Sequence, residues 1–425
     1  MNRTYHRRDV LRILGVGTAL GGAALLGACG GSGGNEAPRE QIASSLSSTT
    51  PENQAATFRN ADRIVYSRTI KRGATTMPLK PHHVSLASLT YDYAGKTTNV
   101  DDYMQRNRTA GLLILKGGAV ALERYGMGNT ETSRWTSWSV AKSVTSTLVG
   151  AALKDGHIAS LDDPVTRYVT ALKGSAYEQN TIRELLRMTS GVRWIEDYDG
   201  TGDSDIARLG EALAEAYGSG KSGSVMELMR TRPRAAAPGS VFNYSTGESY
   251  VLGAVVAAAT GTTLSDYFSR KVWAPFGMEA DGYWELDSEG GLEMGGEGFN
   301  ATLRDYGRFG LFFSREGVVN GTAVLPLGWR DLAGHPDSPV TNYGALYEGF
   351  PLGYGYQWWA LPGKDTTIPA QDRPFTAEGI YGQFIYINPK EDVVAVVWSA
   401  WNNPEDESAR FETYALLSKA VEMLK

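Results

Sequence analysis

Residues 138–153 read WSVAKSVTSTLVGAAL, and within them a polar segment turns into an apolar run. Ser139 and Lys142 stand at i and i+3, so on a helix they project from the same face. A lysine held against a serine hydroxyl in a dry site loses solvation, which disfavours its charged form and lets it accept the serine proton. The other interpretation is an ordinary helix start with a serine cap and a surface lysine. The S-x-x-K spacing by itself does not decide between them, because so short a motif recurs by chance.

The segments around this stretch predict a fold that mixes strands and helices. Hairpins are expected at residues 111–126, turning at Gly117-Gly118, and at residues 383–400, turning at residues 389–392. Helices are expected at residues 139–155, 181–191, 250–261 and 407–425. This order indicates an α/β or α+β fold. We expect an antiparallel sheet flanked by helices, with a mostly helical region inserted at roughly residues 150–290.

The composition excludes several classes of function. The chain has 425 residues, of which 42% are hydrophobic and 21% charged, as in globular proteins. A net charge of −6 with mixed signs provides no basic face, so no nucleic-acid partner is expected. Residues 196–208, EDYDGTGDSDIAR, imitate a calcium loop but lack its closing glutamate, and the histidines show no metal spacing. We therefore expect neither a metal nor an organic cofactor, and the oligomeric state stays open.

Residues 1–28 have the pattern of an export signal. A basic start that contains Arg7-Arg8 is followed by an apolar run and by small residues before Cys29, the single cysteine. The arginine pair resembles a signal for the export of folded proteins, and LGAC at residues 26–29 resembles the lipobox of bacterial lipoproteins. The alternative is a plain secretory signal with an incidental cysteine. We expect a lipoprotein of the bacterial cell envelope or periplasm, anchored to a membrane through lipidated Cys29.

The segment after the cysteine reads as a tether. Residues 29–57 are rich in Gly, Ser, Thr and Asn and show no hydrophobic periodicity, which is typical of a flexible linker. The folded domain is therefore expected to span residues 58–425.

Two later segments supply groups that could complete a site around Ser139. Residues 238–253, PGSVFNYSTGESYVLG, place Tyr244 just before an apolar helix. Its phenol could carry a proton between serine, lysine and leaving group, provided that a cation lowers its pKa; a loop-anchoring tyrosine is the alternative. Residues 375–389, FTAEGIYGQFIYINP, form a glycine-rich strand entry, along whose edge a substrate could lie. One backbone N–H there could form an oxyanion hole with that of Ser139, although a bulged edge strand would explain the glycines equally well.

Taken together and in order, these motifs resemble a known enzyme family. SVAK (139–142), LLRMTSGV (185–192), FNYST (242–246) and AEGIYGQ (377–383) look like the motifs of the S-x-x-K serine hydrolases. That family comprises class C β-lactamases, penicillin-binding carboxypeptidases and related esterases, and the likeness is greatest to the branch of 6-aminohexanoate-dimer hydrolase. It covers nearly all of residues 58–425 and implies a β-lactamase/transpeptidase-like fold with the active site between the sheet and the helical region.

The resemblance also implies roles for individual residues. Ser139 would be the acylated nucleophile, Lys142 its activating amine and Tyr244 the general base that passes the proton to the leaving group. The backbone N–H groups of Ser139 and Ile380 would form the oxyanion hole. Tyr198 matches a tyrosine that contacts the amide substrate in the dimer-hydrolase branch.

Two departures from the β-lactamase pattern bear on the substrate. The third motif of those enzymes begins with lysine or histidine, whereas this chain has Ala377-Glu378-Gly379, and Glu378 is expected to repel a β-lactam carboxylate. The second motif ends in Thr246, where those enzymes usually carry asparagine. With Thr246, Glu378 and Gly379 at the substrate, we expect the hydrolysis of small esters or amides. The alternatives are a β-lactamase or D-alanyl-D-alanine carboxypeptidase, and a non-catalytic, lipid-tethered binding protein.

Overall fold

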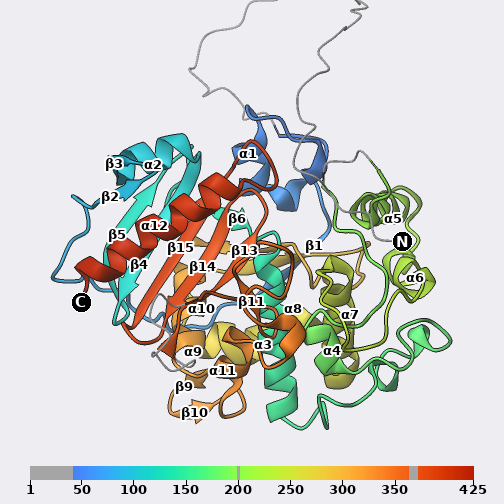
Figure 1. Cartoon of the computed structure of the whole chain (residues 1–425). Coiled ribbons are helices and arrows are strands. Elements are labelled where there is room, and N and C mark those ends of the chain that lie inside the picture. The colour runs from blue at the N-terminus through green and yellow to red at the C-terminus, as the bar shows by residue number, and fades with distance from the viewer. Residues whose placement is uncertain (1–41, 199–201, 363–371) are drawn as a thin grey trace, which may run out of the picture. The chain divides into compact units, whose positions relative to one another are not determined.

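The predicted Gly117-Gly118 turn is present between two long strands, β4 (Thr109–Lys116) and β5 (Ala119–Tyr125). The two glycines have φ angles of 59° and 83°, which a two-residue hairpin turn of this hand requires. The fold is taken from a computed structural model that describes residues 42–198, 202–362 and 372–425 (Figure 1).

This hairpin forms one edge of a seven-stranded antiparallel sheet in the order β11-β12-β13-β14-β15-β4-β5. The other strands are β11 (Gly353–Tyr354), β12 (Trp359–Ala360), β13 (Phe375–Gly379), β14 (Gln383–Asn388) and β15 (Val393–Ser399). Strand β15 pairs with β4, so hairpins nearly 300 residues apart in sequence complete one sheet. The predicted antiparallel sheet and mixed fold class are confirmed.

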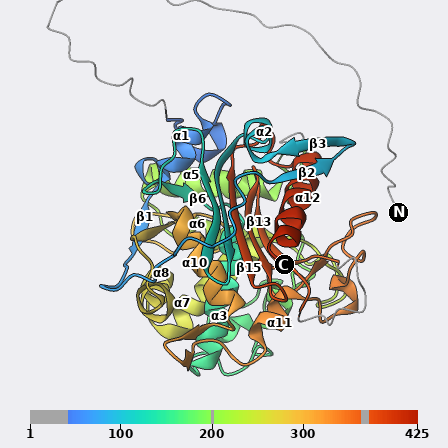
Figure 2. The ribbon, with the colours of Figure 1, turned by 90° about the vertical axis from the view of Figure 1, so that its left-hand side faces the viewer.

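Helices cover both faces of this sheet, as the edge-on view of Figure 2 shows: α12 (Glu407–Met423) lies on one side and α10 (Leu303–Ser314) on the other. Side chains of β4 alternate between the two layers. Leu113 and Leu115 belong to the core that contains α10, whereas Leu112 and Ile114 belong to the core that contains α12. Such alternation follows from the period of two along a strand, and it leaves β4 almost wholly buried.

The helical region is organised around two enclosed helices, α3 (Val140–Lys154) and α7 (Thr246–Thr260), which contact each other, and α3 also contacts β13 and β14 of the sheet. The other α-helices of this region are α4 (Ile182–Leu186), α5 (Asp205–Ser219), α6 (Ser224–Thr231), α8 (Leu264–Phe268) and α9 (Ala274–Phe276), with a π-helical turn at Ser269–Trp273 between the last two. Both α3 and α7 end where glycine adopts positive φ, at Gly156 and Gly261. The predicted insertion of helices between two parts of the sheet is therefore present.

Smaller elements connect these layers. A second, four-stranded sheet has the order β1-β7-β8-β6, and two short hairpins are separate from it. Their strands are β1 (Ser67–Ile70), β6 (Arg134–Thr136), β7 (Gly282–Glu285), β8 (Phe299–Thr302), β2 (Thr90–Tyr93), β3 (Lys96–Asn99), β9 (Val318–Val319) and β10 (Thr322–Ala323). The remaining helices are α1 (Gln54–Arg59), α2 (Val100–Arg106) and α11 (Trp329–Gly334), with short 3₁₀ turns at Leu46–Ser48, Ala61–Arg63, Val165–Arg167, Thr170–Leu172 and Pro339–Thr341.

Across the described ranges, no single helix has both the length and the hydropathy needed to cross a membrane. The stretch Thr246–Thr260 with Leu264–Phe276 reaches them only as a pair, and that pair is bent by 71°.

Two sequence expectations are corrected by the structure. The flexible linker was expected to reach residue 57, but Gln54, Ala55, Ala56 and Thr57 are buried, and Gln54 Nε2 donates to the Trp401 carbonyl at 3.1 Å. The small side chains of this segment show no hydrophobic periodicity in the sequence, so its composition alone indicated a flexible tether. The helix expected at residues 181–191 ends at Leu186, because Met188 adopts a positive φ of 57°. Residues 1–41, with the expected export signal and Cys29, lie outside the described residues.

Candidate active site

The start of α3 brings Ser139 and Lys142 together in the interior. Ser139 immediately precedes the helix and Lys142 lies one turn later, so that the Lys142 Nζ is 2.8 Å from the Ser139 Oγ. Lys142 is only 1% exposed, and Ser139 is 8% exposed. The alternative of a surface lysine beside a capping serine is therefore wrong.

The surroundings of Lys142 determine how a neutral amine would be oriented. Its Nζ also lies 2.8 Å from the Thr246 Oγ1 and 2.8 Å from the Gly296 carbonyl. The carbonyl only accepts, and the Thr246 hydroxyl donates its proton to Glu196, so both must accept from Lys142. A neutral amine then uses its two N–H bonds on these acceptors, and its lone pair faces Ser139.

Burial also favours the neutral amine. Desolvation lowers the pKa of Lys142 from its ordinary value to about 8, although the carboxylates of Glu196 and Glu297 oppose this shift. About a tenth of the amine is therefore neutral and able to accept a proton at pH 7, against about a thousandth or less for an ordinary lysine.

Glu196 is the organising residue to which the sequence assigned no role. Its carboxylate accepts hydrogen bonds from Tyr198 Oη at 2.6 Å and from Thr246 N at 2.9 Å, and further ones from Trp194 Nε1 and Thr246 Oγ1. Thr246, expected at the substrate, is 2% exposed; it joins Glu196 to Lys142 and also lines a cavity beside Ser139. The only sequence signal was the place of Glu196 in a segment that resembles the hydrolase family.

Tyr244 lies two residues before α7, and its ring faces both the lysine and the substrate space. The ring stacks on Trp359 with centroids 5.4 Å apart, and Lys142 Nζ is 4.9 Å from its centroid. Desolvation and the charge of Glu196 raise the pKa of Tyr244 well above 10, and the neighbouring Ser139 hydroxyl offsets only part of this. The sequence made a proton-carrying role for this phenol conditional on a cation that lowers its pKa, and in the resting site desolvation and the charge of Glu196 raise that pKa instead. The resting phenol is protonated and therefore suited to donate a proton.

The end of β13 supplies the backbone expected for an oxyanion hole. A Cβ added at Gly379 would lie 2.5 Å from the Ser137 carbonyl and 3.0 Å from the Ser139 nitrogen, so only glycine allows this approach. Within the described part of the chain, neither the Ser139 nor the Ile380 backbone N–H has a hydrogen-bond partner. Both are free to bind a developing oxyanion.

Two strained residues flank these N–H groups. Trp138, before the serine, has a φ of 46°, and Tyr381, after Ile380, has a φ of 61°. Their rings contact each other at 5.4 Å, and Phe58 packs on both at 5.3 and 5.4 Å. Packing that holds two residues in the left-handed region beside a reactive serine is typical of strain maintained at functional sites. Phe58 thus connects the N-terminal segment to the site, a contact that no local motif indicated.

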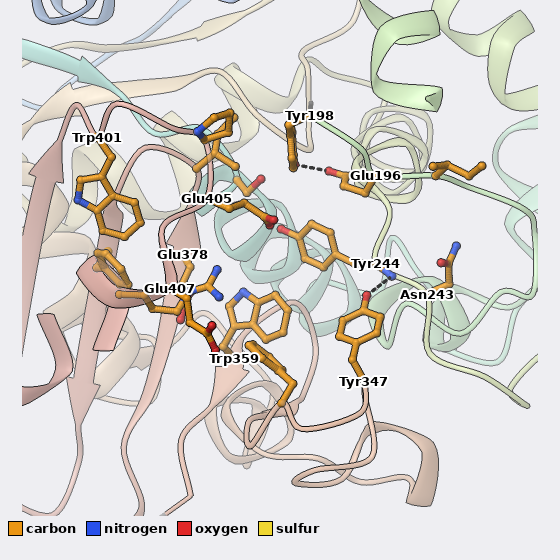
Figure 3. A pocket seen from close by; sticks show the side chains of 18 of the residues that line it. Glu196, Tyr198, Asn243, Tyr244, Tyr347, Trp359, Glu378, Trp401, Glu405 and Glu407 are labelled. Atoms are coloured by element: carbon orange, nitrogen blue, oxygen red, sulfur yellow. Dashed lines mark hydrogen bonds and ion pairs between the residues drawn. The ribbon is translucent and has the colours of Figure 1, made fainter. Parts of the chain in front are cut away.

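Two cavities meet at the serine. The first, of about 700 Å³, is lined by Tyr244, Glu196, Trp359 and Glu378 among others, and Figure 3 shows these side chains around it. The second, of about 720 Å³, lies toward α5 and the N-terminal segment. Ser139, Tyr198, Ile380 and Pro404 line both. The structure therefore brings the expected Tyr198, Glu378 and Gly379 to the site.

The second cavity has many apolar residues in its walls, and four acidic residues also line it: Asp197, Glu211, Glu285 and Glu297. Its apolar walls include Leu46, Ile64, Val65, Ile206, Leu209 and Leu213. The carboxyl groups of Glu285 and Glu297 also line it; burial raises the pKa of Glu285 to about 7 and raises that of Glu297.

Glu378 is not the isolated anion that the sequence indicated. Its carboxylate lies 3.0 Å from Arg410 Nε and accepts a hydrogen bond from Tyr414, both on α12. The expected simple repulsion of a substrate carboxylate by Glu378 is therefore wrong, because a guanidinium from a distant helix compensates its charge.

In the ranges that the structure describes, no three His, Cys, Asp or Glu side chains form a metal-binding group. The described end of the calcium-like loop is paired internally: Arg208 contacts both Asp203 and Asp205, and Arg232 Nη1 is 2.6 Å from Asp205.

Comparison with known proteins gives a consistent result. The family model described as Beta-lactamase matches residues 97–419. The 6-aminohexanoate-dimer hydrolase of Paenarthrobacter ureafaciens is 28% identical over 316 residues, which are 73% of this chain and 78% of that protein. A Bacillus anthracis structure named as a candidate 6-aminohexanoate-dimer hydrolase superposes with a TM-score of 0.79 at 21% identity, over 91% of this chain and 98% of the other. A class C beta-lactamase superposes with a TM-score of 0.55 at 19% identity, over 75% of this chain and 93% of the other.

Proposed function

Because this chain belongs to the beta-lactamase family and is a hydrolase, we propose that it cleaves small carboxylic esters or amides through an acyl-enzyme on Ser139. The observation that carries the proposal is the buried Lys142, whose other two partners can only accept, so that the lone pair of the neutral amine faces the serine hydroxyl. A merely structural lysine would have no need of a proton-accepting orientation.

In the proposed mechanism, Lys142 removes the Ser139 proton as the Oγ attacks the substrate carbonyl carbon. The carbonyl oxygen becomes an oxyanion that accepts from the N–H groups of Ser139 and Ile380. The bond to the leaving group then breaks, and Tyr244 donates its proton to the leaving oxygen or nitrogen. Lys142 reprotonates Tyr244. Water then attacks the acyl carbon and its proton passes to neutral Lys142. The bond to the Ser139 Oγ breaks, the Oγ takes the proton back from Lys142, and the acid leaves.

The two cavities would hold different parts of such a substrate. Tyr244 lines the first cavity and not the second, so the leaving group that it protonates lies in the first. The acyl group then extends into the second cavity, whose apolar walls suit a hydrocarbon chain.

Amide hydrolysis is supported by the relative named 6-aminohexanoate-dimer hydrolase, and the family includes beta-lactamases, so a β-lactam substrate is the second candidate. A penicillin carries a carboxylate close to the scissile bond. The first cavity offers it one guanidinium, Arg410, which Glu378 already pairs. Esters and uncharged amides are therefore the preferred class.

The test is the intact mass of the purified full-length protein after treatment with a fluorophosphonate probe. We expect one adduct on the wild type, none on Ser139→Ala and a rate at least about 100-fold lower on Lys142→Ala. Hydrolysis of p-nitrophenyl esters, short amides and nitrocefin then ranks the substrate classes. A folded wild type that is never acylated would contradict the mechanism and would leave the tethered binding protein as the alternative.

We also propose that the protein is exported and held in the cell envelope through lipidated Cys29, a proposal supported by the sequence pattern of residues 1–29. Incorporation of labelled palmitate into the wild type, and its loss in Cys29→Ala, is the expected result. Equal release of both forms as unmodified protein would contradict it.

A further inference from the structure

The first cavity has the properties of a cation site on the leaving-group side of the serine. This inference rests on the proposed function, since it is Tyr244, as the proton donor, that assigns the leaving group to this cavity.

The charges that line the first cavity are unequal. Its described lining has the four carboxylates Glu196, Glu378, Glu405 and Glu407 and a single guanidinium, Arg410. That guanidinium is already 3.0 Å from Glu378 and also experiences the charge of Glu405. A carboxylate that enters the cavity therefore encounters a surplus of negative charge, and an ammonium is attracted.

The walls between these carboxylates are aromatic. The Tyr244 ring stacks on Trp359 at 5.4 Å, and Phe350 meets the edge of Trp359 at 5.6 Å. Tyr347 packs against Phe350 with ring centroids 6.2 Å apart. Figure 3 shows the rings of Tyr347 and Trp359 beneath the ring of Tyr244. Aromatic faces bind quaternary and primary ammonium groups, and nearby carboxylates add to that attraction.

We propose that this cavity selects esters and amides whose leaving group carries an ammonium close to the scissile bond. The cation would lie against the Trp359 ring, because the Phe350 ring already has the Arg410 guanidinium over it, 5.7 Å from its centroid. Glu405 and Glu407 at the α12 end contribute negative charge. The leaving group departs protonated by Tyr244 and still positively charged.

A matched pair of esters tests this selection. Butyrylcholine and 3,3-dimethylbutyl butyrate have the same acyl group and leaving groups of nearly the same shape, but only the first is charged. With each kcat/KM divided by the rate constant for hydroxide hydrolysis of the same ester, the wild type should prefer butyrylcholine by about tenfold or more. The preference should shrink as salt is raised, because part of it is electrostatic.

Two sets of variants separate the contribution of the Glu405 and Glu407 charges from that of the aromatic wall. Glu405→Gln with Glu407→Gln, and separately Trp359→Leu, should each reduce the preference severalfold. The control is Glu422→Gln, which removes one carboxylate at the far end of α12, where the Glu422 side chain is 65% exposed and paired with Lys419. This control should leave the preference unchanged.

A binding readout is independent of turnover. Choline should slow the labelling of Ser139 by the fluorophosphonate at concentrations where 3,3-dimethylbutanol does not. Equal hydrolysis of both esters, or equal protection by both alcohols, would overturn the cation site and leave the acyl-enzyme mechanism intact. A folded protein that is not labelled at all would instead overturn the proposed function, and the cation site with it.

Discussion

Gly379→Ala tests whether the contact between the end of β13 and the start of α3 forms the oxyanion hole. The added methyl group would lie 2.5 Å from the Ser137 carbonyl, 3.0 Å from the Ser139 nitrogen and 3.1 Å from the Trp138 Cβ. Ordinary contacts begin near 3.4 Å, so the strand must withdraw by about 0.5 to 1 Å. Because Ile380 follows directly, its N–H moves away from the position of the oxyanion.

The magnitude follows from this displacement. A misplacement of about 1 Å in an active site costs about 100-fold in rate, and the loss of one oxyanion donor costs about 100- to 1,000-fold. We expect kcat/KM for a p-nitrophenyl ester to fall by about 100-fold. Overpacking of this kind costs about 1 to 3 kcal/mol of stability, so the variant should still fold.

The assay compares the acylation rate and the thermal unfolding of the variant with those of Gly218→Ala. Gly218 lies in α5, where an added Cβ has nothing within 4 Å, so its replacement should leave the rate unchanged and stabilise the helix by up to about 1 kcal/mol. A folded Gly379→Ala protein with a wild-type acylation rate would refute the assignment of the oxyanion hole to this strand end.

The remaining predictions concern the base, its support and the anchoring of α12. Activity should rise with pH and level off above about 8, because Lys142 must lose its proton to act as base and its pKa is lowered to about 8. A pH profile of kcat/KM measures this, and a flat profile between pH 6 and 9 would exclude the Lys142 amine as the base. Thr246→Val should lower kcat/KM by about 100-fold while Thr246→Ser retains most of it, since only a hydroxyl can accept from Lys142; equal rates for the two variants would contradict this role. Glu412→Gln should destabilise the fold by about 2 kcal/mol at pH 7, because the carboxylate accepts from Tyr91 Oη and Asn107 Nδ2, each at 2.8 Å, and from Arg106. Although burial alone would raise the pKa of Glu412, these bonds lower it. Its contribution is therefore full above pH 4.5 and is lost only as the pH falls through the lowered folded-state pKa. Unfolding measured at pH 7 and at about pH 2 tests this, and an equal deficit at both would contradict it.

Much of the local structure was predictable because short-range physics decides it. Gly117-Gly118 allows a turn that few other pairs allow, and the apolar run after Ser139 can only be an enclosed helix. The ordered motifs likewise predicted a hydrolase of this family, and the fold is confirmed. The packing of residues 42–57 was not predictable, since their small side chains show no period, and neither was the early end of α4 at a non-glycine residue with positive φ.

The sequence by itself determined the order of helices and strands and the pairing of a serine with a lysine one helical turn away, because both depend on neighbours along the chain. Only the tertiary structure decided what that pair can do. Burial lowers the pKa of Lys142, and Glu196, through Thr246, orients the amine toward the serine; the same burial raises the pKa of Tyr244. Arg410 reaches Glu378 from a helix that follows it in the chain by some thirty residues, and its charge compensates that of the glutamate, a pairing that the sequence did not indicate. Desolvation and charge pairing depend on distances in space, which residues remote in sequence acquire only when the chain has folded.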